Sequence, residues 1–220
     1  MKNVAVILCG SGYRDGSEIR ESVATLWALS QERVHVQCFA PNAFQTDVVN
    51  CLTGEPVTSE KRNMLVEAAR IARGEIKPLD QLNVSDFDAL IIPGGFGAAK
   101  NLCDFAFKGS QGTTRPDLEK ILQMFFEKKK PIGAICIAPA ILALALRGKN
   151  LSLTVGSSGE TAQEIEKCGH QHVSTKVTDC HVDTKNKIVT TGAYMFGSAP
   201  LHEVFSGIQK CVQGVLKLTV

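Results

Sequence analysis

Short apolar runs alternate along the chain with segments in which apolar residues recur at helical spacing. The apolar runs predict buried strands. These runs lie at 4–8, 34–40, 88–92, 131–135 and 151–156. The helical pattern predicts helices over 17–32, 60–74, 116–130, 139–147, 160–169 and 199–218. A hairpin is expected from 176–183 and 187–193 with a turn at 184–187, and a loop over 41–58.

Strands that alternate with helices are typical of βαβ units. They predict a mostly parallel sheet covered on both faces, which is a three-layer α/β/α sandwich. No repeat, low-complexity tract or linker interrupts the sequence, so we expect one domain over 1–220. The helix predicted over 17–32 has the pattern of an amphipathic helix. One of its faces carries Ile19, Val23, Leu26, Trp27 and Ser30.

Composition and charge argue against several classes of protein. Of the residues, 44% are hydrophobic and 21% are charged, which is typical of a globular protein. Lys and Arg number 24 and Asp and Glu 22, so the net charge is +2 and a dedicated nucleic-acid surface is not expected. No stretch approaches the ~18 apolar residues of a membrane span, and the first apolar run is too short for a signal peptide. We therefore expect a cytoplasmic protein that binds neither nucleic acid nor membranes.

The eight cysteines do not have the spacing of a metal site. They lie at positions 9, 38, 51, 103, 136, 168, 180 and 211, and no two form a C-x-x-C pair. A zinc site is therefore not expected. Disulfides are not expected either, because no secretory signal is recognised. Most of these thiols are predicted to be small core residues.

The loop after the first predicted strand contains glycines but lacks a nucleotide motif. Gly10, Gly12 and Gly16 are spaced G-x-G-x-x-x-G, which differs by one residue from the dinucleotide fingerprint. No nucleotide cofactor is expected. Glu18 follows this loop, and the pattern leaves two roles open for it. It is either the N3 partner of an Asp15 helix cap or a functional carboxyl group in the cleft.

Two other strand ends carry candidate chemistry. Gly94 and Gly95 directly follow the strand at 88–92, where paired glycines can turn backbone N–H groups toward an anion, although an ordinary tight turn has the same pattern. Cys136 ends the strand at 131–135, just before Pro139 starts a helix. Unpaired N–H groups at a helix start lower the pKa of a thiol, so this pattern leaves two roles open for Cys136, a reactive thiol or a buried structural cysteine. The N–H of Ile137 is then a candidate donor to an oxyanion. Carboxyl ends of parallel strands share one edge, so these groups are expected to converge there.

The linked motifs resemble the class I glutamine amidotransferase-like superfamily, which includes the PfpI-type proteins and the Parkinsonism-associated deglycase. Within it, the chain is most similar to the enhancing-lycopene-biosynthesis proteins and their mitochondrial relatives. The similarity runs nearly end to end. It is carried by "GSGYRDGSEI", "EAARIARG", "PGGFGAAKNL", "CIAP" and "KNKIVTT".

The resemblance implies a flavodoxin-like fold with Cys136 at a strained turn and with Glu18 hydrogen-bonded to its thiol. It implies weak, cofactor-free glyoxalase III-type activity on glyoxal or methylglyoxal, with an aldehyde as the small-molecule partner and a homodimer as the assembly. The enhancing-lycopene proteins also imply a link to isoprenoid supply. Two departures make glutaminase and peptidase activities unlikely. Ala138 replaces a glycine of the glutaminase motif, and Ile137 stands where PfpI-type proteases have a histidine.

A general base is expected among the histidines. We predict His172 in preference to His181, because the antiparallel partner of the last strand should begin near the cleft, just after His172. In the enzyme hypothesis, Cys136 attacks the aldehyde carbon while Glu18 and His172 move protons. In the alternative, the same reactive Cys136 serves redox or metabolite sensing without turnover.

Overall fold

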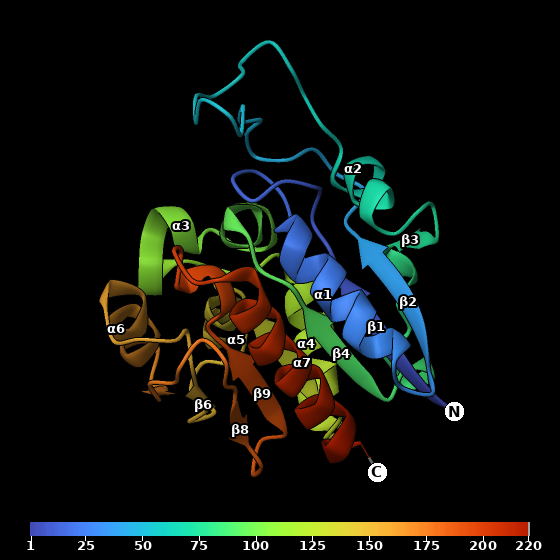
Figure 1. Cartoon of the computed structure of the whole chain (residues 1–220), viewed down its shortest axis with the longest axis vertical. Helices are drawn as coiled ribbons and strands as arrows, with labels where there is room; N and C mark the ends of the chain where they lie inside the picture. The colour runs from blue at the N-terminus through green and yellow to red at the C-terminus, as the bar shows by residue number, and fades with distance from the viewer. Residues whose placement is uncertain (220) are drawn as a thin grey trace.

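One twisted sheet runs through the molecule (Figure 1). Three of its central strands, at 89–92, 132–135 and 188–191, are entirely buried. The computed structural model describes residues 1–219. The sheet order is β3 (Ile76–Pro78), β2 (Val34–Ala40), β1 (Lys2–Ile7), β4 (Ala89–Ile92), β5 (Ile132–Ile135), β9 (Ile188–Thr191) and β8 (His181–Asp183). All neighbours pair in parallel except β8, which is antiparallel to β9. The predicted sandwich with a mostly parallel, flavodoxin-like sheet is confirmed.

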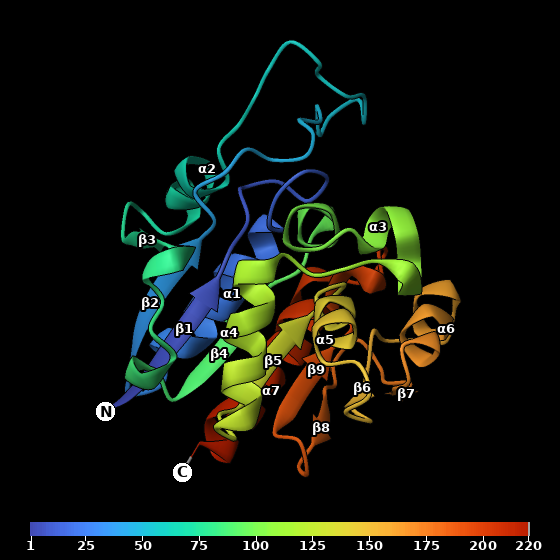
Figure 2. The same cartoon turned by 180° about the vertical axis from the view of Figure 1, so that it is seen from behind.

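Helices cover both faces of this sheet, as Figures 1 and 2 show from opposite sides. One face is covered by α1 (Ile19–Ser30), α2 (Met64–Ile71) and α7 (Leu201–Leu218). The other is covered by α3 (Phe105–Lys108), α4 (Pro116–Glu127), α5 (Pro139–Ala145) and α6 (Glu160–Lys167). Successive strand side chains point to opposite faces, so Val4 and Val6 pack toward α1 and α7 whereas Ala5 and Ile7 pack toward α4 and α5. Burying a Val or Ile side chain of this kind stabilises the fold by about 1.5–3 kcal/mol.

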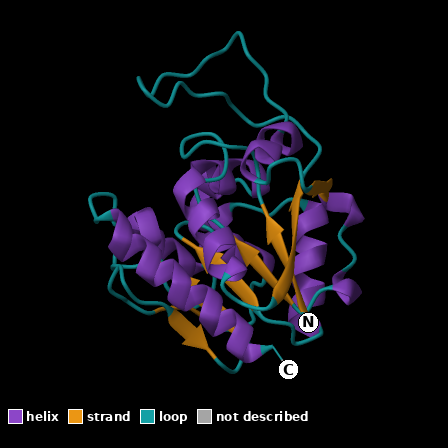
Figure 3. Ribbon diagram, turned by 45° about the vertical axis from the view of Figure 1, so that its right-hand side comes forward, coloured by secondary structure: helices purple, strands orange, loops and turns teal. Residues whose placement is uncertain are grey.

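The predicted elements are present, most of them shorter than their patterns. The strand expected over 151–156 is reduced to β6 (Ser152–Leu153), which pairs with β7 (Gln171–His172) in a separate two-stranded sheet. The first strand of the expected hairpin shrinks to β8. The loop between β2 and α2 extends away from the layers and carries the isolated bridge Val49–Pro56 (Figure 3).

The face of α1 that packs on the sheet differs from the amphipathic face expected from the sequence. Ile19, Val23 and Trp27 are each close to half exposed. The buried face instead carries Glu21, Ser22, Ala24, Thr25, Ala28 and Leu29. The small side chains let α1 approach the sheet and α7 closely, and the larger ones remain outside.

The chain order produces a switch point beside β1. From β1 the chain proceeds to β2 and β3 on one side, then returns to β4 on the other side of β1. The loops that follow β1, β4, β5 and β9 all leave the sheet at its carboxyl edge, which is where open α/β sheets bind ligands. Within residues 1–219, no helix is long and apolar enough to cross a membrane.

Candidate active site

Cys136 occupies a strained turn directly after β5. Its φ of 61° is in the left-handed region, which non-glycine residues rarely adopt. Such a conformation costs on the order of 1–3 kcal/mol and persists where the surroundings enforce it. Here the backbone N–H of Cys136 donates to the carbonyl oxygen of Thr191 on β9 at 2.8 Å, and α5 begins three residues later. The turn holds the thiol at the carboxyl edge with 7% of the residue exposed.

Glu21, in the first turn of α1, provides the carboxyl group beside this thiol. It is fully buried and hydrogen-bonds the Cys136 side chain. Its Oε2 accepts from the N–H of Gly94 at 3.0 Å, and its Oε1 accepts from the N–H of Tyr194 at 3.2 Å. Burial, and then the charge of Glu18, raise the pKa of Glu21 to about 8, against the opposing effect of these hydrogen bonds. The carboxyl group therefore keeps its proton at pH 7.

Glu18 does not make the expected contact with the thiol. It is the N-cap of α1, and its Oε2 accepts from the backbone N–H of Glu21 at 2.6 Å. The expectation is wrong because α1 begins at Ile19, which turns the carboxyl group three residues later toward Cys136. Asp15 is not the cap either, since its buried Oδ2 accepts from the N–H of Val49.

The thiol itself is not acidified overall. Burial, and then the charge of an ionised Glu21, raise the pKa of Cys136 well above its ordinary value. Hydrogen bonds from the N–H groups of Gly95 and Ile137 act in the opposite direction. The expected lowering of the pKa at a helix start is therefore outweighed by desolvation. A free thiolate is therefore disfavoured at this position. The thiol has to lose its proton as its sulfur bonds to the target, or the thiolate has to be stabilised by a hydrogen bond from the protonated carboxyl group of Glu21.

The paired glycines after β4 have separate roles. A Cβ atom on Gly94 would lie 2.5 Å from the Cβ of Cys136 and 2.8 Å from Oε2 of Glu21, so this position requires glycine. Its N–H is committed to Glu21 and is not free to bind an oxyanion as expected. Gly95 has a φ of +100°, and its N–H contacts the thiol together with that of Ile137. Those two donors are the candidates for stabilising an oxygen on a carbon bound to Cys136.

A cavity of about 310 Å³ opens onto the thiol. It is lined by Tyr13, Glu18, Gly95, Phe96, Cys136, Ile137, Thr161, Tyr194 and Met195. These residues come from the loops after β1, β4, β5 and β9 and from the start of α6. The aromatic and aliphatic side chains favour a small organic molecule, and the carboxyl and thiol groups supply its polar contacts.

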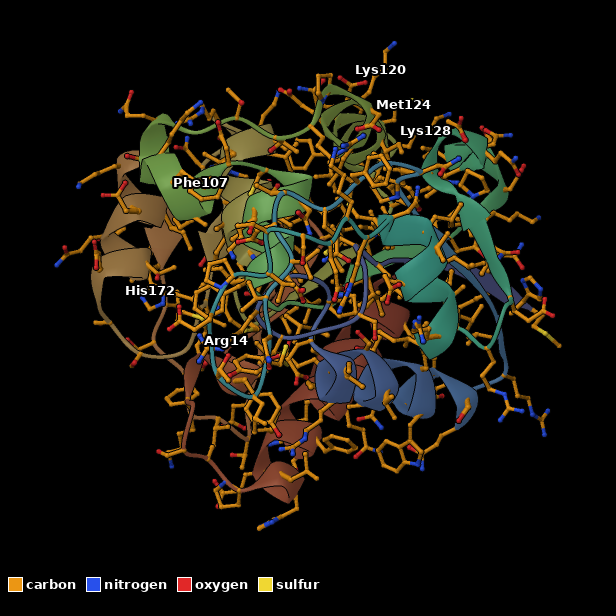
Figure 4. The ribbon with its side chains drawn as sticks, turned by 90° about the horizontal axis from the view of Figure 1, so that it is seen from above. Arg14, Phe107, Lys120, Met124, Lys128 and His172 are labelled. Carbon is orange, nitrogen blue, oxygen red and sulfur yellow. The ribbon has the colours of Figure 1, made fainter. Side chains whose placement is uncertain are left out.

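The structure does not bring His172 to this cavity. His172 lies on β7, to one side when the carboxyl edge is viewed from above (Figure 4), and its Nε2 accepts from the N–H of Val155 at 3.3 Å. Its expected position is wrong because β8 begins only at His181, so that His172 joins the small sheet instead. His181 bonds Ser152 through Nε2 at 2.7 Å. Over residues 1–219, the cavity has no histidine in its lining.

The glycine-rich loop after β1 is closed on itself. The N–H of Gly12 donates to the carbonyl of Ser17, and the N–H of Gly16 donates to that of Gly12. Gly16 also packs against Gly97, where an added Cβ atom would lie 2.4 Å from the Cα of Gly16. These N–H groups hold loops together and are not arranged for a phosphate. Through residue 219, no group of three or more His, Cys, Asp or Glu side chains is placed to hold a metal ion.

Glu21 was not predicted as a site residue, although the sequence pattern around it marks it as a candidate. Glu21 is followed at i+3, i+4 and i+7 by Ala24, Thr25 and Ala28, the small residues of the buried face. A carboxyl group in line with a buried stripe is costly unless it is paired or neutral, so it marks a functional candidate.

Comparisons with known proteins agree with this fold. The model of the DJ-1/PfpI family matches residues 5–197. The human glutamine amidotransferase-like class 1 domain-containing protein 3, mitochondrial, is 44% identical over 98% of this chain and 83% of its own length. The ES1 protein, mitochondrial, of Danio rerio is 31% identical over 99% of this chain and 86% of its length. A crystal structure of an isoprenoid biosynthesis protein with an amidotransferase-like domain from Ehrlichia chaffeensis superposes with a TM-score of 0.92, at 38% identity and with 99% of both chains covered.

These comparisons confirm the resemblance stated from the motifs and correct one expectation. The human and Danio rerio relatives are mitochondrial proteins by name. The expected cytoplasmic location is contradicted by this finding.

Proposed function

Because this chain belongs to the DJ-1/PfpI family, we propose that it is a cofactor-independent glyoxalase-type enzyme, which adds water to a small 2-oxoaldehyde such as methylglyoxal or glyoxal to give the 2-hydroxy acid. One observation carries the proposal. A buried thiol, Cys136, contacts a buried carboxyl group, Glu21, that holds its proton at neutral pH, and the thiol faces an open cavity. Such a pair supplies a nucleophile together with a group that gives and takes protons.

The first step is addition of the thiol to the aldehyde. The sulfur of Cys136 bonds to C1, the C1 carbonyl π bond breaks, and its oxygen takes up a proton to give a hemithioacetal. The protonated carboxyl group of Glu21 gives its proton to the C1 oxygen and accepts the proton of the thiol, so no net charge is created. The N–H groups of Gly95 and Ile137 stabilise negative charge that develops during the addition.

The later steps convert the adduct to product. A proton moves from C1 to C2, which turns the hemithioacetal into a thioester of the 2-hydroxy acid. Water then attacks the thioester carbonyl, the carbon–sulfur bond breaks, and the thiol regains its proton. The sum is 2-oxoaldehyde plus water to 2-hydroxy acid, without an oxidant, a reductant or a cofactor. Burial of Cys136 opposes formation of its thiolate, so we expect the reaction to be slow.

The cavity lining does not support the two other activities that the family resemblance suggests. Amide and peptide hydrolysis need an acid that protonates the leaving amine, a role that histidine fills in Cys–His enzymes. In the part of the chain that the structure describes, the lining beside Cys136 contains no histidine. We therefore do not propose glutaminase or peptidase activity.

Turnover of methylglyoxal tests the proposal. The protein, dialysed against EDTA, should form lactate, and Cys136→Ser should form none above background. A matched control is Cys9→Ser, which changes a buried thiol that does not line the cavity. Lactate formation that is equal in the wild type and Cys136→Ser contradicts the proposal.

A second function is supported by the burial of Cys136, which is 7% exposed, since burial slows a nucleophile and a slow nucleophile suits capture of a metabolite better than rapid turnover. Mass spectrometry of the intact protein distinguishes the two. A stable adduct of methylglyoxal on Cys136 without release of lactate favours a sensing role. The name of the Ehrlichia chaffeensis protein would then suggest that the captured metabolite belongs to isoprenoid metabolism.

A further inference from the structure

The proposed reaction needs a base that the pair of Cys136 and Glu21 does not provide. After the thiol has bonded to C1, the hydrogen on that carbon must be removed before it can be replaced on C2. At neutral pH Glu21 is protonated, and it is occupied with the oxygen and sulfur atoms. A histidine cannot serve as this base, because the described part of the cavity lining contains none.

The other side chains that line the cavity leave few candidates for this base. Tyr13 accepts a hydrogen bond from Nε of Arg14 at 2.7 Å through its phenol oxygen, and Tyr194 accepts one from Nη1 of Arg20 at 3.2 Å. A phenol oxygen that faces a guanidinium is a poor proton acceptor. Thr161 carries an alcohol, which does not serve as a base by itself. The remaining titratable side chain of the lining is Glu18.

Glu18 is held in place at the cavity wall. Its Oε2 accepts from the N–H of Glu21, and the N–H of Arg20 also bonds the carboxyl group. An ionised carboxylate offers about four acceptor positions, so two such bonds leave others available. The carboxyl group lies in the same cavity as Cys136, without touching the thiol as Glu21 does.

The two carboxyl groups differ in burial and in their charged neighbours, because Glu18 is partly exposed at the cavity wall whereas Glu21 is buried. Burial raises the pKa of Glu18, but the bonds from N–H groups and the charge of Arg20 favour its ionised form. Glu21 is fully buried and has no cation among the influences on it. Of two neighbouring carboxyl groups in such different surroundings, the fully buried one is suited to act as the acid, and the partly exposed one beside a cation is suited to act as the base.

We propose that the carboxylate of Glu18 is the catalytic base that removes the C1 hydrogen from the hemithioacetal on Cys136, and this inference rests on the function proposed above. The C–H bond electrons become the C1–C2 double bond, and the C2 oxygen takes a proton from Glu21, which gives an enediol. Protonated Glu18 then gives its proton to C2, and the C1 hydroxyl returns one proton to Glu21 as its carbonyl forms. Both carboxyl groups end as they began, and the thioester is ready for water.

Glu18→Gln is the decisive variant, because Gln keeps an oxygen for the helix cap but cannot accept the C1 proton. Its kcat should fall by roughly 10²-fold or more, the lower end for a general base, with little change in KM or melting temperature. The hemithioacetal on Cys136 should still form, as intact mass shows. Glu18→Asp, which keeps a carboxylate, should recover part of the rate. Glu127→Gln changes an exposed residue that does not line the cavity, so it is the matched control and should match the wild type.

Solvent deuterium provides a second readout. Transfer through Glu18 allows exchange with water, so lactate formed in heavy water should carry deuterium at C2. Lactate that retains the original C1 hydrogen at C2 in full indicates a direct hydride shift and overturns the role of Glu18. The same conclusion follows if Glu18→Gln turns over at the wild-type rate. A wild-type protein that forms no lactate instead contradicts the proposed function itself, so the two failures are distinguishable.

The pH profile separates a base from a merely structural cap. In the wild type, kcat/KM should rise with pH as Glu18 ionises and fall again as Glu21 loses its proton near pH 8. In Glu18→Gln, the rising limb should disappear from the residual activity. A rising limb that is unchanged in this variant assigns the ionisation to another group and overturns the inference.

Discussion

Two cysteines follow parallel strands of the same sheet, but their surroundings differ. Cys9 follows β1, is completely buried, and lies 3.5 Å from the hydroxyl oxygen of Ser17, and burial raises its pKa to about 12. Cys136 follows β5 with a left-handed φ, contacts a protonated carboxyl group and lines a cavity. A position at a strand end is shared by both. The strained turn and the adjacent acid are what distinguish Cys136 from the core thiol Cys9.

Removal of each sulfur in turn should have very different effects at the two positions. Cys136→Ser should lower turnover of methylglyoxal by roughly 10³-fold or more, because the nucleophile is lost. Cys9→Ser should retain most of the activity, since Cys9 does not line the cavity. Lactate formation by both variants, measured against the wild type, checks this. Equal losses would mean that the two thiols are not functionally distinct.

The protonated acid beside Cys136 should make stability depend on pH. The pKa of Glu21 is about 8 in the fold, against an ordinary 4.5, so the unfolded chain gives up this proton first as the pH rises. The stabilisation is complete below pH 4.5 and is lost between pH 4.5 and 8, with a total of about 5 kcal/mol. Urea unfolding of the wild type and Glu21→Gln across this range measures it. If the two proteins have the same pH dependence, Glu21 is not the buried acid described.

The close contact between the loop after β4 and Cys136 has no counterpart at Cys9 and should be sensitive to added volume. Gly94→Ala would place a methyl group 2.5 Å from the Cβ of Cys136 and should cost about 1–3 kcal/mol of unfolding free energy, the range for overpacking. Gly159→Ala is the control, because nothing lies within 4 Å of its Cβ position and its φ is extended. Thermal unfolding monitored by circular dichroism compares them. A silent Gly94→Ala would show that the turn has room to relax.

The smallest effect expected is on alkylation of Cys136. Above pH 8 the ionised Glu21 opposes formation of the thiolate, so Glu21→Gln should react several-fold faster with iodoacetamide at pH 9. Near pH 6 both proteins hold a neutral group there, and their rates should be closer. Peptide mass spectrometry over time measures the rate at position 136, with Cys9 as an internal reference. A wild type that reacts faster at pH 9 contradicts the assigned direction.

The alternation of strands and helices and the turn at Cys136 could be predicted from the sequence for a simple reason. Apolar runs such as the one ending at Ile135 are buried on both faces of a parallel sheet and leave an unbroken pattern. Pro139, three residues beyond Cys136, marks the start of a helix. The junction between a strand and a helix could therefore be located to the residue.

The partners of Cys136 were less accessible. His172 was predicted on the assumption of a long hairpin strand, whereas β8 has three residues and His172 pairs in another sheet. Glu18 was predicted as the thiol's partner, whereas it caps α1 and Glu21 makes the contact. Both errors concern which of several nearby residues faces the cleft. Element boundaries decide that question, and a sequence pattern defines boundaries to within a few residues.

What the sequence alone determined is the alternation of strands and helices, the common edge at which their loops meet, and the candidate nucleophile Cys136. These follow from local patterns of apolar residues and from proline. Only the tertiary structure decided the rotation of α1, which buries Ala24 and Ala28 and leaves Trp27 half exposed. That rotation depends on how closely small side chains let the helix approach the sheet and α7. It places Glu21 against the thiol and Glu18 at the wall of the cavity.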